Sequence, residues 1–331
     1  MKKYIILFFS FCVLPAFFTQ AFAQKYSHYI TVAKDGSGDF TSIQKAIESC
    51  KSFPYQQITV YIKNGVYNEK VLIPEWNPKI TLMGQSRDRT VIVYGDYFHK
   101  INKGPNSTFY TATLTVQGNE LLAENLTIEN NAGPVGQAIA LDVDADKCSF
   151  VNCKITGNQD ALYVAGENFR NYFNKCFIEG TTDFIFGGAT ALFDSCTIIC
   201  KANAYITAAS TAKNASYGFV FKNCHIKALP QVNKVYLGRP WRKYAKVVFI
   251  NCAMGAFIAP EGWKDWNTSQ KTVFYAEYHS TGKGADSAGR VSWSHQLTKQ
   301  ALGKYTVKNI FTVNENAWEP LSNFSLSNKE Y

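Results

Sequence analysis

A short pattern of apolar and polar residues recurs along the middle of the chain. Five segments share the order Phe-x-x-Cys-x-Ile, with Met in place of Ile in the last: residues 150–155, 173–178, 193–198, 221–226 and 249–254. Their cysteines follow one another at intervals of 23, 20, 28 and 28 residues, and Leu126 stands in the cysteine position of a further copy upstream. A period of this length is typical of solenoids, in which each copy forms one coil.

The residues of each copy indicate which kind of solenoid this is. Apolar residues alternate with polar ones and include many Phe, Ile and Val, which favour strands. No ten-residue helical period lies between the copies. We therefore predict an all-β fold, a parallel β-helix, in which the equivalent cysteines stack as an inward-facing ladder of small apolar side chains.

The sequence before the repeat predicts a helix that caps the solenoid, and strands of further coils. Thr41 and Gln44 form a capping box for a helix with Ile43, Ala46, Ile47 and Cys50 on its apolar face. We expect this short helix to cover the end of the solenoid, because an open end would expose the core and unpaired backbone. A short helix is also predicted for 296–305, and early strands for 29–33, 58–62, 71–73, 80–83 and 91–93.

The first residues have the order of a secretory signal peptide. Two lysines precede an apolar run over residues 4–18, and Ala21-Phe22-Ala23 follows as a small-x-small site. We predict a signal peptide over residues 1–23 and a single domain over residues 24–331, secreted or periplasmic. The apolar run is too short for a comfortable membrane span. We expect a mature protein that is monomeric and not bound to a membrane.

Charge narrows the choice of partner. The chain has 34 basic and 25 acidic residues, and cleavage after Ala23 would leave 32 basic and 25 acidic, a net charge of +7. A basic protein favours an anionic partner. The lysines and arginines are scattered and no nucleic-acid motif is present, which argues against DNA or RNA. A secreted basic protein more plausibly meets an acidic polysaccharide.

Eight cysteines would remain after this cleavage, and an oxidising compartment would let them pair. Packing in the ladder is the expected role of most of them. Cys176 and Cys196 are the pair that we predict to form a disulfide, because a 20-residue coil brings equivalent positions within bonding reach.

Two aspartates stand at equivalent positions of neighbouring copies. Asp160 lies seven residues after Cys153, and Asp183 lies seven residues after Cys176. In a parallel β-helix these carboxyl groups would lie one above the other, about 5 Å apart. Two carboxylates at that distance cannot both ionise without a large cost, so we expect their pKa values to be pushed apart.

Three further polar residues complete a chemically useful set. Arg239 would lower the pKa of one carboxyl and keep it charged as a nucleophile, while the other stays protonated as an acid. Gln137 and Gln159 would supply amide donors to an oxyanion. Each residue alone has a structural explanation, since a lone Gln in a β-helix is often part of a side-chain ladder and a lone Arg is often a surface ion pair. Together they suit acyl transfer.

Other functions remain open at this point. A polysaccharide lyase or glycosidase on the same solenoid would also use carboxylates, and about 5 Å between them suits a retaining glycosidase. A non-catalytic glycan-binding solenoid would keep the aromatic loops but would need no matched pair of aspartates. The chain has no Gly-x-Ser-x-Gly motif, which argues against a serine hydrolase of that kind.

Several motifs in the same order resemble the pectinesterase family, the pectin methylesterases. They are residues 32–39, 157–162, 182–187, 237–241 and 318–320. The resemblance covers nearly all of the chain after the signal segment. It implies a right-handed parallel β-helix that hydrolyses the methyl esters of homogalacturonan in pectin, without a metal or cofactor.

The resemblance also implies roles for individual residues. Asp183 matches the nucleophile, Asp160 the acid and then base, and Arg239 the partner of Asp183. Gln137 and Gln159 match the oxyanion donors. Substrate binding is implied for Thr108, Gln137, Tyr163, Phe186, Arg239 and Trp241.

Overall fold

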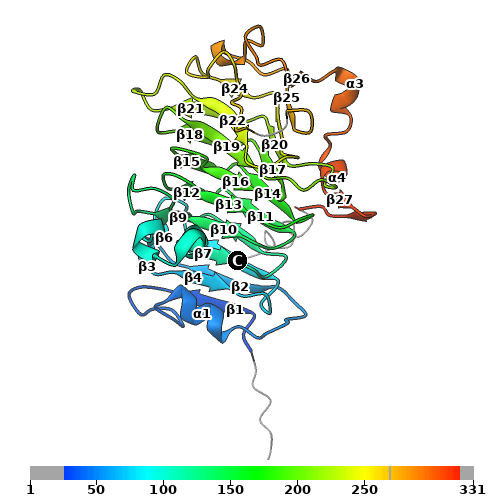
Figure 1. Cartoon of the computed structure of the whole chain (residues 1–331). Helices are drawn as coiled ribbons and strands as arrows, with labels where there is room; N and C mark the ends of the chain where they lie inside the picture. Colours follow the sequence, from blue (N-terminus) through cyan, green and yellow to red (C-terminus); the bar gives the residue numbers. More distant parts are fainter. Residues whose placement is uncertain (1–25, 268–269, 321–331) are drawn as a thin grey trace, which may run out of the picture.

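The computed structural model describes residues 26–267 and 270–320. Three parallel sheets of 11, 8 and 7 strands, here called sheets A, B and C, run along the molecule (Figure 1). Through most of the chain, successive strands pass from one sheet to the next. Each coil therefore adds one strand to each sheet, and the predicted parallel β-helix is confirmed.

Each sheet is built from strands of successive coils. Sheet A contains β1 (Tyr29–Val32), β2 (Ile58–Ile62), β5 (Ile80–Gly84), β8 (Leu122–Glu124), β11 (Cys148–Val151), β14 (Arg170–Asn174), β17 (Thr190–Asp194), β20 (Phe219–Lys222), β23 (Lys246–Ile250), β25 (Phe274–Tyr278) and β26 (His295–Gln296). Sheet B contains β3 (Gly65–Asn68), β6 (Thr90–Tyr94), β9 (Thr127–Asn130), β12 (Lys154–Thr156), β15 (Phe177–Gly180), β18 (Thr197–Cys200), β21 (His225–Ala228) and β24 (Ala253–Met254). Sheet C contains β4 (Val71–Ile73), β7 (Leu114–Val116), β10 (Leu141–Val143), β13 (Leu162–Val164), β16 (Ile185–Gly187), β19 (Tyr205–Ala209) and β22 (Tyr236–Pro240). The five predicted early strands agree with β1, β2, β4, β5 and β6 to within one residue at each end, whereas β3 was not predicted.

Side chains at equivalent positions form ladders inside the coils. Phe150, Phe173, Phe193, Phe221 and Phe249 stack ring on ring, with centroids 4.4–4.8 Å apart between neighbours. All five rings are fully buried. The alternating pattern of the repeat thus supplies one apolar side chain to the same place in every coil.

The turn from sheet A to sheet B also repeats. The residue before the cysteine position has φ between 49° and 57° in six successive coils, at Asn125, Asn152, Lys175, Ser195, Asn223 and Asn251. Asn is the side chain most easily accommodated in this left-handed conformation after Gly. The Asn-Cys pairs of the repeat therefore encode a sharp turn followed by an inward-facing residue.

The predicted disulfide between Cys176 and Cys196 is absent, and that prediction is wrong. All eight cysteines in the described part of the chain are buried free thiols. The Cys176 and Cys196 thiols instead donate to carbonyl oxygens of the preceding coil, on Phe150 and Phe173, at 3.3 Å each. The thiols of Cys153, Cys224 and Cys252 donate to the preceding coil in the same way, so no pair of thiols is singled out for bonding. We also predict that Cys148, Cys153, Cys224 and Cys252 are buried free thiols, and this is confirmed.

Helix α1 (Ile43–Ser49) lies at the N-terminal end of the coils, with Ile43, Ala46 and Ile47 buried as predicted (Figure 1). Its N-cap is Ser42 rather than Thr41. Glu69, from the following coil, accepts from the Ser42 hydroxyl and from the backbone N–H groups of Ile43 and Gln44. A carboxylate distant in sequence thus does what the local capping box was expected to do.

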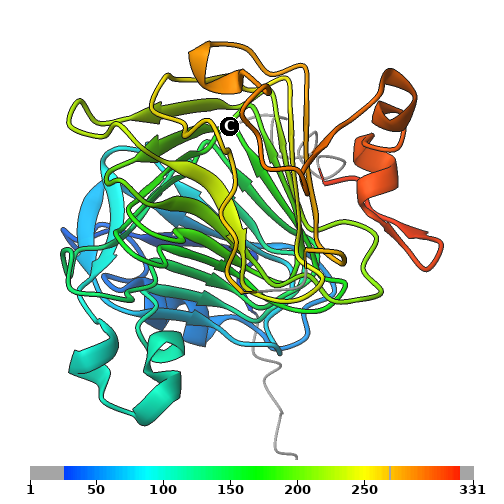
Figure 2. The ribbon, with the colours of Figure 1, turned by 45° about the horizontal axis from the view of Figure 1, so that its top comes forward.

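The C-terminal segment follows the last long strand of sheet A, and its part after residue 296 packs against the outside of that sheet. It contains η2 (Lys283–Ala285), α3 (Lys299–Leu302), α4 (Val307–Ile310) and the antiparallel pair β27 (Thr312–Val313) and β28 (Asn316–Ala317). Ile310 and Phe311 join a buried cluster with Tyr172, Leu192 and Val220 of sheet A, and Figure 2 shows this segment beside the coils. The helix predicted for 296–305 is realised only as α3, because residue 296 pairs in β26.

Two sequence predictions concern membranes and targeting. The predicted signal peptide, residues 1–23, lies outside the described residues. No helix between residues 26 and 320, as far as the structure describes them, is long and apolar enough to cross a membrane.

Candidate active site

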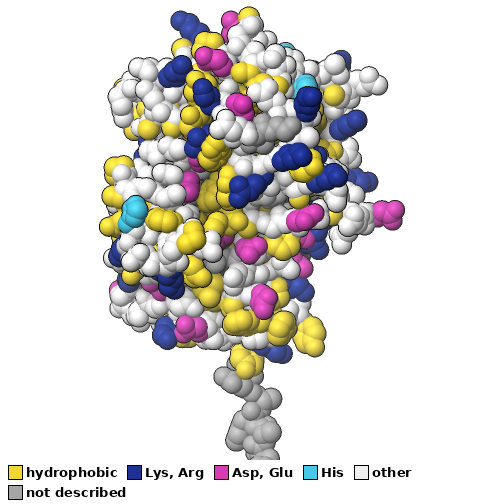
Figure 3. Space-filling model, in the orientation of Figure 1, with side chains coloured by type: hydrophobic (Ala, Val, Ile, Leu, Met, Phe, Trp, Pro, Cys, Tyr) yellow, Lys and Arg dark blue, Asp and Glu magenta, His cyan; other side chains and the backbone are white. Residues whose placement is uncertain are grey.

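An apolar surface lies on the outer face of sheet C. The strand register places Tyr163, Phe186, Ala208 and Arg239 beside one another on β13, β16, β19 and β22. Phe186 and Ala208 belong to a small buried cluster outside the coils, and Tyr163 and Trp241 pack against it. A column of hydrophobic side chains is visible over the middle of this face (Figure 3). The surface is suited to the apolar faces of sugar rings.

Asp160 and Asp183 lie at the start of β13 and β16, in equivalent places. Leu162 pairs with Ile185, so the two aspartates face each other one strand spacing apart, about 5 Å. Their φ angles are 62° and 50°, in the left-handed region. Backbone conformations of this kind cost about 1–3 kcal/mol and occur often at functional sites.

Hydrogen bonds to the next coil hold these strained positions. The Asp160 N–H donates to the carbonyl of Thr182 at 3.1 Å, and the Asp183 N–H donates to the carbonyl of Tyr205 at 2.9 Å. Both carboxyl groups are therefore positioned by the regular stacking of the coils rather than by a mobile loop.

Arg239 binds Asp183 through two parallel hydrogen bonds. Its Nε lies 3.0 Å from Oδ1 and its Nη2 lies 2.6 Å from Oδ2. The guanidinium lies between two aromatic rings, 4.1 Å from the centroid of Tyr205 and 3.8 Å from that of Trp266. The ion pair is largely enclosed, with the Asp183 side chain only 6% exposed. A planar fork fixed in this way orients the carboxylate as well as neutralising it.

The two carboxyl groups differ in their surroundings. The carboxyl group of Asp160 has no hydrogen-bond or ion-pair partner within the described residues. Burial, and then the charge of Asp183, raise the pKa of Asp160 well above its ordinary value, although Arg239 opposes this. These surroundings favour the protonated form of Asp160, the form that can serve as an acid.

The predicted lowering of the Asp183 pKa is wrong in its net direction. Burial raises the pKa of Asp183, and the hydrogen bonds and charge of Arg239 only partly offset that effect. The sequence suggested the ion pair but not the depth at which the carboxyl is buried. Arg239 is the group that favours the ionised form of Asp183 against the effect of burial.

Gln137 and Gln159 lie beside each other at the start of β10 and β13, where their backbones form an isolated parallel bridge. Gln159 accepts from the Ala138 N–H at 3.1 Å through its backbone carbonyl. Neither side-chain amide has a hydrogen-bond partner among the residues that the structure describes. Two amide groups next to Asp160 are therefore available to a ligand.

Aromatic rings extend the surface on both sides of the aspartates. Tyr163 stacks on Phe186 with centroids 4.6 Å apart, and Phe186 lies 5.9 Å from Trp241. Phe109 lies 5.1 Å from Tyr163, from the 3-10 helix η1 (Gly104–Tyr110). Thr108 of η1 stands next to Phe109, and only 8% of it is exposed.

Three residues at this surface were not identified from the sequence. Tyr205 lies opposite Asp183 in the next coil. Counting back from the paired strands in the sequence could therefore have identified Tyr205. Phe109 and Trp266 come from segments outside the repeat, and no spacing marks them. The structure brings Asp160, Asp183 and Arg239 together at sheet C, and it places the backbones of Gln137 and Gln159 side by side next to Asp160.

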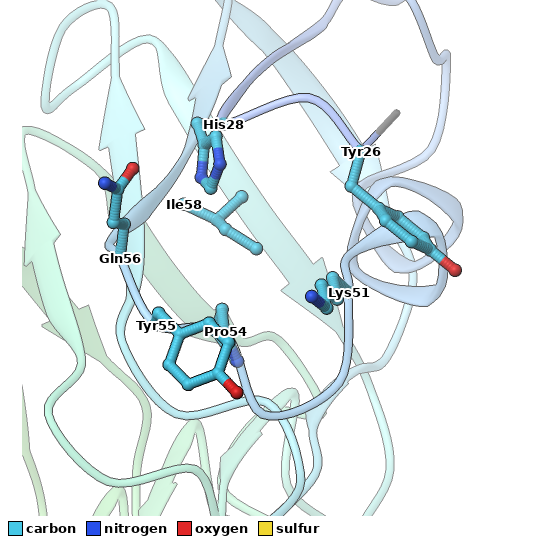
Figure 4. A pocket seen from close by; sticks show the side chains of 7 residues that line it. All are labelled: Tyr26, His28, Lys51, Pro54, Tyr55, Gln56 and Ile58. Atoms are coloured by element: carbon cyan, nitrogen blue, oxygen red, sulfur yellow. The ribbon is translucent and has the colours of Figure 1, made fainter. Parts of the chain in front are cut away.

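Two other observations bear on the choice of site. Across residues 26–267 and 270–320, no group of three or more His, Cys, Asp or Glu side chains could hold a metal ion. A hollow of about 350 Å³ lies at the N-terminal end, where His28, Tyr55 and Ile58 are among its lining residues (Figure 4). No carboxyl group lines it, so it offers none of the chemistry found over sheet C.

Comparison with known proteins identifies the family. The family model described as Pectinesterase matches residues 29–314. Pectinesterase 31 of Arabidopsis thaliana is 36% identical over 83% of this chain and 90% of its own length. Pectinesterase of Petunia integrifolia is 36% identical over 87% of this chain and 80% of its own length. By contrast, the chain spans about half of two Arabidopsis relatives named as combined pectinesterase and pectinesterase inhibitor, 48% and 50%.

Solved structures agree. Pectin methylesterase from carrot has a TM-score of 0.80 at 32% identity, over 85% of this chain and 92% of that protein. A pectin methylesterase in complex with a hexasaccharide has a TM-score of 0.76 at 28% identity, over 90% of this chain and 99% of that protein. The chain therefore belongs to the pectinesterase family, the carboxylic ester hydrolases that demethylate homogalacturonan.

Proposed function

We propose that this pectinesterase hydrolyses the methyl esters of homogalacturonan over sheet C, with Asp183 as nucleophile and Asp160 as acid and then base. The observation that carries the proposal is the contrast between the two carboxyl groups. Asp183 is bound by Arg239 at 2.6 and 3.0 Å, whereas Asp160 next to it has no partner within the described residues. One carboxyl is set up to attack and the other to give a proton.

In the first half of the reaction, Asp183 attacks the ester carbonyl carbon and a C–O bond forms. The negative charge moves to the carbonyl oxygen, which accepts hydrogen bonds from the side-chain amides of Gln137 and Gln159. Donors of this kind stabilise such a transition state by about 2.7–4 kcal/mol each. The bond to the methoxy oxygen then breaks, methanol leaves with the proton of Asp160, and an anhydride with Asp183 remains.

In the second half, Asp160 acts as a base. It takes a proton from water as the water oxygen attacks the substrate carbonyl carbon. The bond from that carbon to Asp183 breaks, so Asp183 is again a carboxylate paired with Arg239. The product is a free galacturonic acid unit, and Asp160 is protonated for the next cycle.

The aromatic rings and the loop of η1 would hold the polysaccharide. Tyr163, Phe186 and Trp241 form a continuous apolar strip beside the aspartates, and Thr108 stands at its edge. Two solved relatives are complexes with hexasaccharides, which supports binding of several sugar units along this strip. Basic residues exceed acidic ones in the chain, which favours an acidic polymer.

Two further properties are proposals from the sequence. The signal-like segment over residues 1–23 supports export, so the mature enzyme would be secreted or periplasmic and would meet its substrate outside the cytoplasm. We expect it to act as a monomer.

Methanol release from methyl-esterified pectin, measured beside the appearance of new reducing ends, tests this function. The proposal predicts methanol with no new chain ends. Chain ends without methanol would contradict it, because they would show a lyase or glycosidase acting on the same polymer.

A further inference from the structure

A hollow of about 750 Å³ continues the substrate surface toward the N-terminal end of sheet C. It lies over β4, β7, β10 and β13 and is walled on one side by η1. Tyr163 and Phe109 line it, and Tyr163 also stacks on Phe186 beside Asp183. The hollow is therefore one to three strand spacings, about 5–15 Å, from the reacting carboxyl groups. A sugar unit in it would be a neighbour of the unit being hydrolysed.

Two carboxyl groups line this hollow. Asp142 faces outward from β10 and pairs in register with Tyr163, and Asp144 follows at the end of the same strand. Asp142 is only 7% exposed, and its Oδ1 has no hydrogen-bond partner. A buried carboxyl oxygen without a partner is costly in a folded protein, so a ligand group that completes its hydrogen bonding would be favoured there.

The one basic side chain among the lining residues, Lys70, is already engaged. Lys70 lines the hollow, but its Nζ lies 3.0 Å from Asp96 and donates to the Tyr110 carbonyl at 2.6 Å. The other lining residues are neutral, and several are apolar, including Leu72 and Tyr110. The hollow thus combines acidic and apolar groups with no uncommitted positive charge among its lining residues.

We propose that this hollow is a subsite for a methyl-esterified galacturonate unit and that Asp142 and Asp144 exclude a unit with a free carboxylate. Homogalacturonan offers only these two forms, one neutral with an apolar methyl group and one negatively charged. Like charges at short range in a partly buried site repel strongly, while the methyl group finds apolar neighbours. The inference rests on sheet C being the substrate surface.

The pKa values of Asp142 and Asp144 determine the pH at which the proposal is tested. Burial, with a smaller contribution from the charge of Asp144, raises the pKa of Asp142 to about 7. Burial also raises the pKa of Asp144. Asp142 is therefore mostly ionised only above about pH 7, so the measurements are made at pH 8.

The experiment compares kcat/KM per ester for methanol release from two substrates at pH 8. One is a fully methyl-esterified oligogalacturonide, and the other is the same oligomer partly de-esterified with base. The wild type should favour the first by about tenfold or more. Asp142→Asn and Asp144→Asn should each reduce this ratio, and the double variant should bring it near one. Asp286→Asn, at an exposed carboxyl after η2, should keep the wild-type ratio.

Methanol release by the wild type from the fully esterified oligomer tests the hydrolase function itself. The ratio of kcat/KM between the two oligomers tests the proposed role of the hollow. Asp144 is exposed, so Asp144→Asn provides a folded test even if Asp142→Asn lowers stability. A wild-type ratio near one, or an unchanged ratio in Asp144→Asn and the double variant, would overturn the proposal. A ratio that rises in the variants would also overturn it, because the acids would then be favouring the carboxylate.

Discussion

Asp160 and Asp183 occupy the same backbone position in neighbouring coils, and their partners alone distinguish them. Asp183 has the two hydrogen bonds from Arg239, while Asp160 has a neighbouring negative charge and no partner within the described residues. At the scale of single residues, the proposed division of labour between nucleophile and acid therefore depends on one arginine.

Replacing Arg239 tests that dependence through the pH profile. Burial raises the pKa of Asp183 and Arg239 opposes the rise, so Arg239→Gln should raise this pKa further. The rate falls on the acid side as Asp183 gains a proton, and the acid limb of kcat/KM should therefore move to higher pH. Arg239→Lys should shift the limb less but still lose rate, because a lysine cannot form the planar fork. An acid limb that stays in place in Arg239→Gln would contradict the assignment.

Asp160→Asn tests the acid. Asp160 must be protonated to release methanol, and its pKa is raised well above the ordinary value, so the wild-type rate should fall on the alkaline side as the proton is lost. In the variant this limb should vanish together with most of the rate, since an amide cannot give the proton or activate water. The midpoints of the acid and alkaline limbs are properties of Asp160 and Asp183 together, because groups this close titrate as a coupled pair. A remaining rate that still falls at the wild-type alkaline midpoint would show that another group is the acid.

At the scale of elements, the repeat in the sequence predicts the coils well because each coil contributes the same inward-facing side chains. Strands β2 and β4 have the predicted bounds. Contacts distant in sequence are harder to predict. Glu69 of the next coil caps α1, whose N-cap is Ser42 rather than Thr41. Trp266 contacts Arg239 from a loop outside the repeat. The spacing of the aspartates revealed the site, but only the fold shows that Asp183 is deeply buried.

Strand β22 carries Arg239, and the residue before it, Gly238, lies tightly against Thr207 of β19. A Cβ at Gly238 would stand 1.9 Å from Thr207 Oγ1 and 2.9 Å from the Thr207 carbonyl oxygen. Gly238→Ala should therefore push β22 outward, lower the free energy of unfolding by about 1–3 kcal/mol, and reduce activity by displacing Arg239. Urea unfolding and methanol release measure the two effects.

Gly303→Ala is the matched control for this change. The nearest atom to a Cβ at Gly303 is the Gln300 carbonyl oxygen at 3.4 Å, and the site lies after α3, away from sheet C. This variant should unfold within experimental error of the wild type. Equal unfolding midpoints for Gly238→Ala and Gly303→Ala would show that the close approach of the strands is unimportant.

At the scale of the whole molecule, the interior is a set of apolar ladders without a covalent bond between coils. The cysteine ladder is fully enclosed, and burial raises the pKa of the Cys148 thiol to about 12, which makes it a poor nucleophile. Stability therefore comes from packing and from the parallel hydrogen bonds of three sheets.

This arrangement predicts eight free thiols in the protein that remains after cleavage at the expected signal site. A thiol count in denaturant should give eight with or without prior reduction, and a count on the native protein should give almost none. The melting temperature should not change with reductant. A count that falls by two without reductant would restore the disulfide between Cys176 and Cys196 and would contradict the ladder of free thiols.

The proposed mechanism requires Asp183 to attack the carbonyl carbon of the ester. The most direct measurement is the rate of methanol release from methyl-esterified pectin by Asp183→Asn, with circular dichroism to confirm the β-helix and Asp88→Asn, at an exposed carboxyl, as the control. We predict a folded Asp183→Asn protein without measurable turnover and an Asp88→Asn protein at the wild-type rate. Methanol release by Asp183→Asn at the wild-type rate would contradict the mechanism.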